Sequence, residues 1–113
     1  PPGVPSPTQT PAPVDTSGPA INNLSLTWDG CTVYGDAQIS DPSGVIWAEF
    51  WFNPNDVGWS WIQMNDLGTS WRSQTGILAG PTGTIQYKVR SLDTLYNESW
   101  SEVISHNYAY CGE

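Results

Sequence analysis

From Ala20 onward, apolar and polar residues alternate in short runs that are separated by Gly, Pro, Asn, Asp and Ser. An alternation with a period of two residues is typical of strands that bury one face, and no segment has the 3.6-residue period of a helix. The pattern predicts strands over residues 21–28, 32–40, 45–53, 59–64, 70–77 and 84–93, and a last strand within 99–110. Seven short strands without helices indicate an all-β, antiparallel sandwich.

The third and sixth predicted strands divide their residues between two faces. Their expected inward sides carry small, aliphatic and aromatic residues: Ile46, Ala48, Phe50 and Phe52 in one, and Ile85, Tyr87, Val89 and Ser91 in the other. Their expected outward sides are unusual, because tryptophans and charges are interleaved: Trp47, Glu49 and Trp51 in one, and Gln86, Lys88, Arg90 and Leu92 in the other. We therefore expect the outward side to carry any binding chemistry.

Residues 1–19 differ in composition from the rest of the chain, because they contain seven prolines spaced by small and polar residues. Such a segment favours an extended polyproline II conformation and acts as a semi-rigid spacer. We expect a linker over 1–19 and one β-domain over 20–113. Because the sequence opens in the linker without a Met, we expect the chain to be one module of a longer protein.

The charge of the chain restricts the classes of partner that it is expected to bind. Lys and Arg total three against eleven Asp and Glu, which gives a formal net charge of −8. A chain of this charge repels nucleic-acid phosphates and anionic lipid head groups, and no apolar run approaches the length of a membrane span. We expect no nucleic-acid partner and no direct membrane contact; a protein or a neighbouring domain of the same chain is the favoured partner.

Two cysteines, Cys31 and Cys111, nearly bracket the predicted domain. Neither has a second close ligand of the kind that zinc and redox motifs require. They are either two buried thiols or one disulfide formed in an oxidising compartment. We favour the disulfide, which together with the stalk-like linker predicts an extracellular or cell-surface location.

The segment Gly83–Asp93 resembles the sixth strand of fibronectin type III and related bacterial extracellular Ig-like domains, where an aromatic, an aliphatic and a small residue alternate into the core. Asn97-Glu98-Ser99-Trp100-Ser101 is similar to the turn and Trp-Ser pair that follow it, and Asp41-Pro42-Ser43-Gly44-Val45 is similar to a turn of bacterial surface modules. The resemblance implies a seven-stranded immunoglobulin/fibronectin type III-like sandwich. Cys111, which comes after the last strand, departs from the antibody pattern, so antibody-like roles do not follow.

In this class of sandwich the third and sixth strands are neighbours in one sheet. The resemblance therefore implies that Trp47 and Trp51 lie across from Lys88 and Arg90, with Trp100 extending the stack. Two interpretations of this face stay open: a structural ladder of cations over indoles, or a recognition surface. The candidate binding face comprises Trp47, Trp51, Trp59, Lys88, Arg90 and Trp100.

Catalytic machinery is not evident. His106 is the single histidine, and Asp41, Asp56, Asp66 and Asp93 fall at turns, without the spacing of an EF-hand loop. We expect a non-catalytic module without metal or cofactor, acting as a spacer or protein-interaction domain. One alternative is a carbohydrate-binding module that uses Trp47, Trp51 and Trp59, with polar groups from Asn53, Asn55, Asp56 and Gln63. The other is the ligand-sensing ectodomain of a membrane receptor or kinase.

Overall fold

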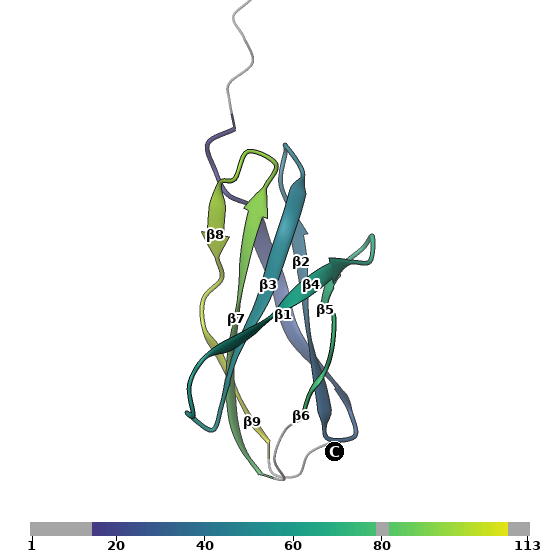
Figure 1. The fold of residues 1–113 in the computed structure, drawn as a ribbon, viewed down its shortest axis with the longest axis vertical. Helices are drawn as coiled ribbons and strands as arrows, with labels where there is room; N and C mark the ends of the chain where they lie inside the picture. The colour runs from purple at the N-terminus through teal and green to yellow at the C-terminus, as the bar shows by residue number, and fades with distance from the viewer. Residues whose placement is uncertain (1–14, 79–81, 109–113) are drawn as a thin grey trace, which may run out of the picture.

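The computed structural model describes residues 15–78 and 82–108, which form antiparallel strands without helices (Figure 1). Among these residues no helix is long and apolar enough to cross a membrane. The strands in this part of the chain are β1 (Ala20–Asp29), β2 (Thr32–Ser40), β3 (Val45–Pro54), β4 (Ser60–Asp66), β5 (Trp71–Ser73), β6 (Ile77–Leu78), β7 (Gly83–Asp93), β8 (Glu98–Trp100) and β9 (Ile104–Tyr108).

The strands make one curled sheet, shaped like a half-barrel. Their order is β1-β2-β5-β4-β3-β7-β8, with β6 also paired to β2 and β9 to β7. Strand β4 joins the two walls of the half-barrel: residues 60–63 pair with β3, whereas residues 64–66 pair with β5. In Figure 1, β4 accordingly runs obliquely across the molecule between β3 and β5. The all-β, antiparallel prediction is confirmed, and the seven-stranded sandwich stays a prediction.

Two of the expected strands are divided. The strand expected over residues 70–77 is the pair β5 and β6, and the last expected strand is interrupted at residues 101–103 between β8 and β9. The first interruption falls where the pairing partners change, because β5 pairs with both β2 and β4, whereas β6 pairs with β2. The second falls between two stretches, β8 and β9, that each pair with β7. The alternation pattern predicts extended backbone but does not predict where a ladder breaks.

The core lies between the walls and contains most of the residues that the alternation assigned to it. Phe50 and Val89 are fully buried, and Gly35 lies directly against Phe50. A Cβ at Gly35 would be 2.1 Å from the Phe50 ring, so any larger residue would displace that ring. The buried apolar side chains are Val33, Ala37, Ala48, Phe50, Met64, Trp71, Ile77, Ile85, Tyr87, Val89 and Tyr108.

Ile46, which the alternation places inward, is 44% exposed, so that prediction is wrong. The β3–β7 pairing shifts register here: Val45 is opposite Asp93 and Trp47 is opposite Leu92. Ile46 is therefore an extra residue on its strand, as in a β-bulge, and the bulge directs its side chain away from the core. Trp47 onward resumes the expected alternation.

Residues 15–18 of the expected linker lie against the domain, at the end where the β2–β3 and β7–β8 turns meet (Figure 1). The Asn97 side-chain amide donates to the Asp15 carbonyl at 2.9 Å, and the Ser43 hydroxyl donates to the Asp15 carboxylate at 3.0 Å. Gly18 lies so close to β8 that a Cβ there would be 2.2 Å from the Ser99 hydroxyl oxygen. Residues 1–14, the rest of the expected linker, lie outside the described residues.

Candidate functional site

The predicted binding residues come together on the outward side of β4, β3, β7 and β8. The ladder places Trp51 opposite Trp61 on one side and opposite Lys88 on the other, and places Arg90 opposite both Glu49 and Trp100. Trp59 immediately precedes β4. We call this surface the tryptophan face, which comprises Trp47, Trp51, Trp59, Trp61 and Trp100 together with Glu49, Lys88 and Arg90.

The Lys88 ammonium group lies among three indole rings. Its nitrogen is 4.5 Å from the centre of the Trp59 ring, 4.7 Å from that of Trp100 and 5.9 Å from that of Trp51. In the part of the chain that the structure describes, this group has no ion pair or hydrogen bond. Attraction by the negative faces of the indoles therefore takes the place of an anionic partner.

Arg90, two residues along the same strand, is neutralised. Its guanidinium donates to Glu98 and, at 3.1 Å, to Glu49, while it lies 5.9 Å from the Trp100 ring. The hydrogen bond to Glu98 and the negative charge of Glu49 raise the pKa of Arg90 above its ordinary value. The structure thus forms the ladder of alternating cations and indoles that one of the two interpretations predicts.

Glu49 organises the buried half of the face. It is only 6% exposed, and its two carboxylate oxygens accept the indole N–H groups of Trp47 at 2.7 Å and Trp51 at 2.9 Å. With the Arg90 contact, these bonds compensate the desolvation of the carboxylate. Sequence reasoning placed Glu49 on this side but missed its role, although an acid between two tryptophans at two-residue spacing was a usable indication.

Three rings of the face remain open to solvent: Trp59 is 37% exposed, Trp100 44% and Trp61 47%. Trp61 contacts the two partly buried tryptophans, with ring centres 6.3 Å from Trp51 and 6.3 Å from Trp47. Sequence reasoning did not include Trp61 in the face, because its outward direction depends on the β3–β4 register. It is nevertheless the most exposed of these rings.

Ser101 holds Trp100 in place where the edge of the sheet is interrupted. Its backbone N–H donates to the Val89 carbonyl at 2.8 Å, and its hydroxyl oxygen accepts the Val89 N–H at 2.8 Å. A side chain thereby replaces the missing partner strand between β8 and β9. The Trp-Ser pair is thus a local unit in which the serine anchors the backbone that positions the indole.

A polar hollow continues the same side of the sheet beyond Trp51 and Lys88. Asn53 and Gln86 are opposite each other in the β3–β7 ladder, and the Asn53 amide donates to the Gln86 side-chain oxygen at 3.3 Å. The hollow has a volume of about 440 Å³, and its lining residues are Asn53, Asn55, Asp56, Gly83, Thr84 and Gln86. Three of the four polar residues that the sequence suggested for a sugar site therefore lie together, whereas Gln63 lies elsewhere on β4.

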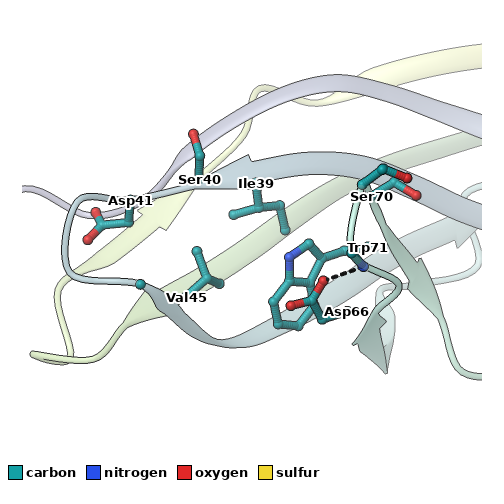
Figure 2. Close-up of a pocket in the computed structure, with 10 residues that line it drawn as sticks. Ile39, Ser40, Asp41, Val45, Asp66, Ser70 and Trp71 are labelled. Atoms are coloured by element: carbon teal, nitrogen blue, oxygen red, sulfur yellow. Dashed lines mark hydrogen bonds between the residues drawn. The ribbon is translucent and has the colours of Figure 1, made fainter.

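A second hollow lies between the β2–β3 turn and the β4–β5 hairpin. Figure 2 shows Asp41 and Asp66 toward its opposite ends, with Ile39 and the Trp71 indole between them. Its volume is about 240 Å³, below the roughly 300 Å³ at which small-molecule sites begin. The polar hollow is therefore the better candidate for a ligand site.

Asp15, Asp41 and Asp93 are the described residues that could hold a metal ion, because one carboxylate oxygen from each lies within 4.8 Å of the others. A hydrogen bond with Asp41 raises the pKa of Asp15. Desolvation opposes ionisation of Asp93, but hydrogen bonds from Asn97 and the Leu95 backbone outweigh it and lower the pKa. Sequence reasoning missed this cluster, because Asp15 belonged to the expected linker.

The other predicted features stand apart from these sites. Cys31 lies in the exposed turn between β1 and β2, and its predicted partner Cys111 lies outside the described residues, so the disulfide stays a prediction. His106 is exposed on β9, where its ring centre is 5.9 Å from that of Trp28. Neither residue lies on the tryptophan face.

In comparisons with known proteins, no family model matches the chain, and neither a curated protein nor a solved structure matches it significantly. Function is therefore inferred from the residues and contacts of the site itself.

Proposed function

We propose that the chain is a non-catalytic, immunoglobulin/fibronectin type III-like module of a larger secreted or membrane-anchored protein, and that the tryptophan face docks a protein partner or a neighbouring domain. The observation that carries this proposal is the simultaneous exposure, by 37–47%, of Trp59, Trp61 and Trp100 on one side of one sheet. Monomeric soluble proteins rarely leave a contiguous aromatic surface unused.

The way in which these rings are supported favours docking by a rigid surface. Each exposed ring contacts a ring or cation beneath it: Trp61 lies on Trp47 and Trp51, and Trp59 and Trp100 lie on Lys88. Side chains that are already ordered lose little conformational freedom when a partner binds. Tryptophan is also among the residues that contribute most at protein interfaces.

The charge of the face indicates what the partner presents. Arg90 is paired with Glu49 and Glu98, whereas Lys88 forms no ion pair with a described residue. A complementary partner would therefore combine an apolar patch with an acidic group near Lys88. The extracellular setting rests on the predicted Cys31–Cys111 disulfide and on the proline-rich linker.

A quencher experiment followed by affinity enrichment tests the proposal. Acrylamide should quench the exposed indoles in the isolated chain and quench them less in the intact parent protein or with a bound partner. In enrichment from the extracellular fraction, Trp61→Ser should weaken capture about thirtyfold, the loss expected for one dominant interface residue.

Tyr96→Ser is the matched control, because Tyr96 is 74% exposed on the β7–β8 turn and lies outside the tryptophan face. It should leave both capture and quenching unchanged. Equal quenching in all states, together with equal capture by both variants, would refute docking on this face.

A further inference from the structure

We propose that the polar hollow at the end of the tryptophan face is a binding site for a neutral saccharide. The proposal goes beyond docking of a protein, because the residues that line the hollow differ from the exposed rings; only Trp59, which the proposal assigns as an aromatic wall for the sugar, belongs to both surfaces. The volume of about 440 Å³ lies within the roughly 300–1,000 Å³ range of small-molecule sites.

The walls of the hollow are held in place before any ligand binds. Asn55 and Asp56 both adopt the left-handed conformation, with φ of 51° and 58°, in the β3–β4 turn. Asn55 is fixed across this turn to β7, because its N–H donates to the Thr84 carbonyl at 2.7 Å and its side-chain oxygen accepts the Thr84 N–H at 3.0 Å. Consecutive left-handed residues other than glycine are costly, and they persist only where surrounding contacts impose them.

Both donors and acceptors remain available in the hollow. The Gln86 oxygen accepts from Asn53, but the Gln86 amide nitrogen donates to no described residue. One Asp56 oxygen is 3.5 Å from the Asn53 amide, and the other accepts no hydrogen bond from a described residue. The Thr84 hydroxyl donates to Asn107 at 2.8 Å, which leaves its lone pairs free to accept. An amide donor beside a carboxylate and a hydroxyl acceptor suits adjacent hydroxyl groups, each of which both donates and accepts.

Trp59 does not line the hollow itself, but its chain neighbour Gly58 is bonded to a lining residue, so the proposal assigns the Trp59 indole as the aromatic wall. The Gly58 N–H donates to the Asn53 side-chain oxygen at 2.9 Å, so the residue before Trp59 is anchored to the hollow. Gln86 and Lys88 project from the same side of β7, and the Lys88 nitrogen is 4.5 Å from the Trp59 ring centre. The apolar C–H face of a sugar ring can pack on the indole while its hydroxyls bind the polar groups.

The charge of the site selects against acidic ligands. The Asp56 carboxylate lines the hollow, and the whole chain carries a formal charge of −8. Asp56 is the charged residue of the lining, and Lys88 is not part of the lining, so phosphates and uronic acids are repelled inside the hollow, whereas neutral sugars are not. Neutral hexose, pentose or N-acetylhexosamine units are the ligand class that fits.

The test is a titration of the full 113-residue chain, followed by amide and indole NMR signals, with neutral oligosaccharides of glucose, xylose and N-acetylglucosamine. At least one of them should produce saturable shifts at the side-chain amides of Asn53 and Gln86 and at the indole N–H of Trp59. Oligogalacturonate, an acidic probe, should not.

Variants locate the site. Gln86→Leu and Asp56→Asn should each weaken binding roughly three- to tenfold, the loss expected for one hydrogen bond, without changing the backbone amide spectrum outside the hollow. Gln63→Leu is the matched control on the same side of the sheet and should bind like the unmodified chain.

Three results would overturn the proposal. They are the absence of shifts with every neutral probe, shifts confined to Trp61 and Trp100, and Gln86→Leu and Asp56→Asn variants that bind as tightly as the unmodified chain. Binding of oligogalacturonate at the hollow would refute the preference for a neutral sugar. Loss of protein capture by Trp61→Ser bears on docking alone, so the two proposals fail separately.

Discussion

Replacing Lys88 by methionine removes the positive charge of the ladder and keeps most of the apolar side chain. A cation over an indole stabilises by about 0.5–1 kcal/mol when exposed and about 2 kcal/mol when desolvated. Lys88 is partly buried and its nitrogen lies 4.5, 4.7 and 5.9 Å from three ring centres, so an intermediate loss is expected. Because Lys88 has no ion pair in the described part of the chain, the change leaves no partner charge behind. We expect Lys88→Met to lower the free energy of unfolding by about 1 kcal/mol.

Arg90→Met is the variant with which the loss of stability in Lys88→Met is compared. It leaves the Glu49 carboxylate, which is 6% exposed, with two indole donors but without its cation. Removing one partner of a buried ion pair costs about 3–5 kcal/mol, and the indole bonds offset part of it. We expect a loss of about 3 kcal/mol, larger than that of Lys88→Met.

The assay is urea unfolding at neutral pH, followed by far-ultraviolet circular dichroism, with thermal melting as a second measure. For a domain of this size a loss of about 1 kcal/mol corresponds to a midpoint roughly 4–8 °C lower. A Lys88→Met variant as stable as the unmodified chain would show that the amine contributes nothing to the ladder. An Arg90→Met loss no larger than that of Lys88→Met would refute the role assigned to Glu49.

The lowered pKa of Asp93 predicts a contribution to stability that is present above about pH 4 and is lost as the pH falls through the folded-state pKa. In melts below pH 4, the melting midpoint of Asp93→Asn should therefore depend less on pH than that of the unmodified chain. The raised pKa of Asp15 predicts the reverse, stability present below about pH 4 and lost as the pH rises; a slope unchanged in Asp15→Asn would contradict it. Reducing the predicted Cys31–Cys111 disulfide should cost about 4–5 kcal/mol, and an unchanged melting midpoint would argue against the bond. Ser101→Ala leaves the Val89 N–H without its acceptor and should cost about 1–3 kcal/mol in urea unfolding, whereas a neutral effect would refute the anchoring role.

The strands were predictable because their sequence pattern is local. Alternation over residues 32–40 and 84–93 places Val33, Ala37, Ile85 and Val89 inward, and each is buried. The predicted inward direction of the Ile46 side chain was wrong, because one inserted residue reverses the side to which a strand directs its side chains. A bulge depends on the pairing with the neighbouring strand, and an isolated strand pattern does not contain that information.

The candidate site was predictable to the extent that it follows from two adjacent strands. Trp51 and Lys88 are opposite each other, as the resemblance implied, but the expected pairing of Trp47 with Arg90 is wrong: Trp47 is opposite Leu92, and Arg90 is opposite Glu49. Trp61 and Asp15 were missed, because their positions depend on the hairpin register and on the path of the linker end. Contacts of that kind join residues far apart in sequence, for example Asp15 and Asn97, which are 82 positions apart.

The packing of the indoles gives the tryptophan face an optical signature. The pairs Trp51–Trp100, Trp51–Trp61 and Trp47–Trp61 have ring centres 5.4–6.3 Å apart, and their planes are inclined by 56°, 27° and 67°. At such separations the electronic transitions of neighbouring indoles couple, and a tilted arrangement makes the coupled transitions chiral. We therefore expect an exciton couplet in the indole absorption region, superimposed on the β-sheet spectrum. Its amplitude would report the geometry of the rings, without any label, in every variant described above.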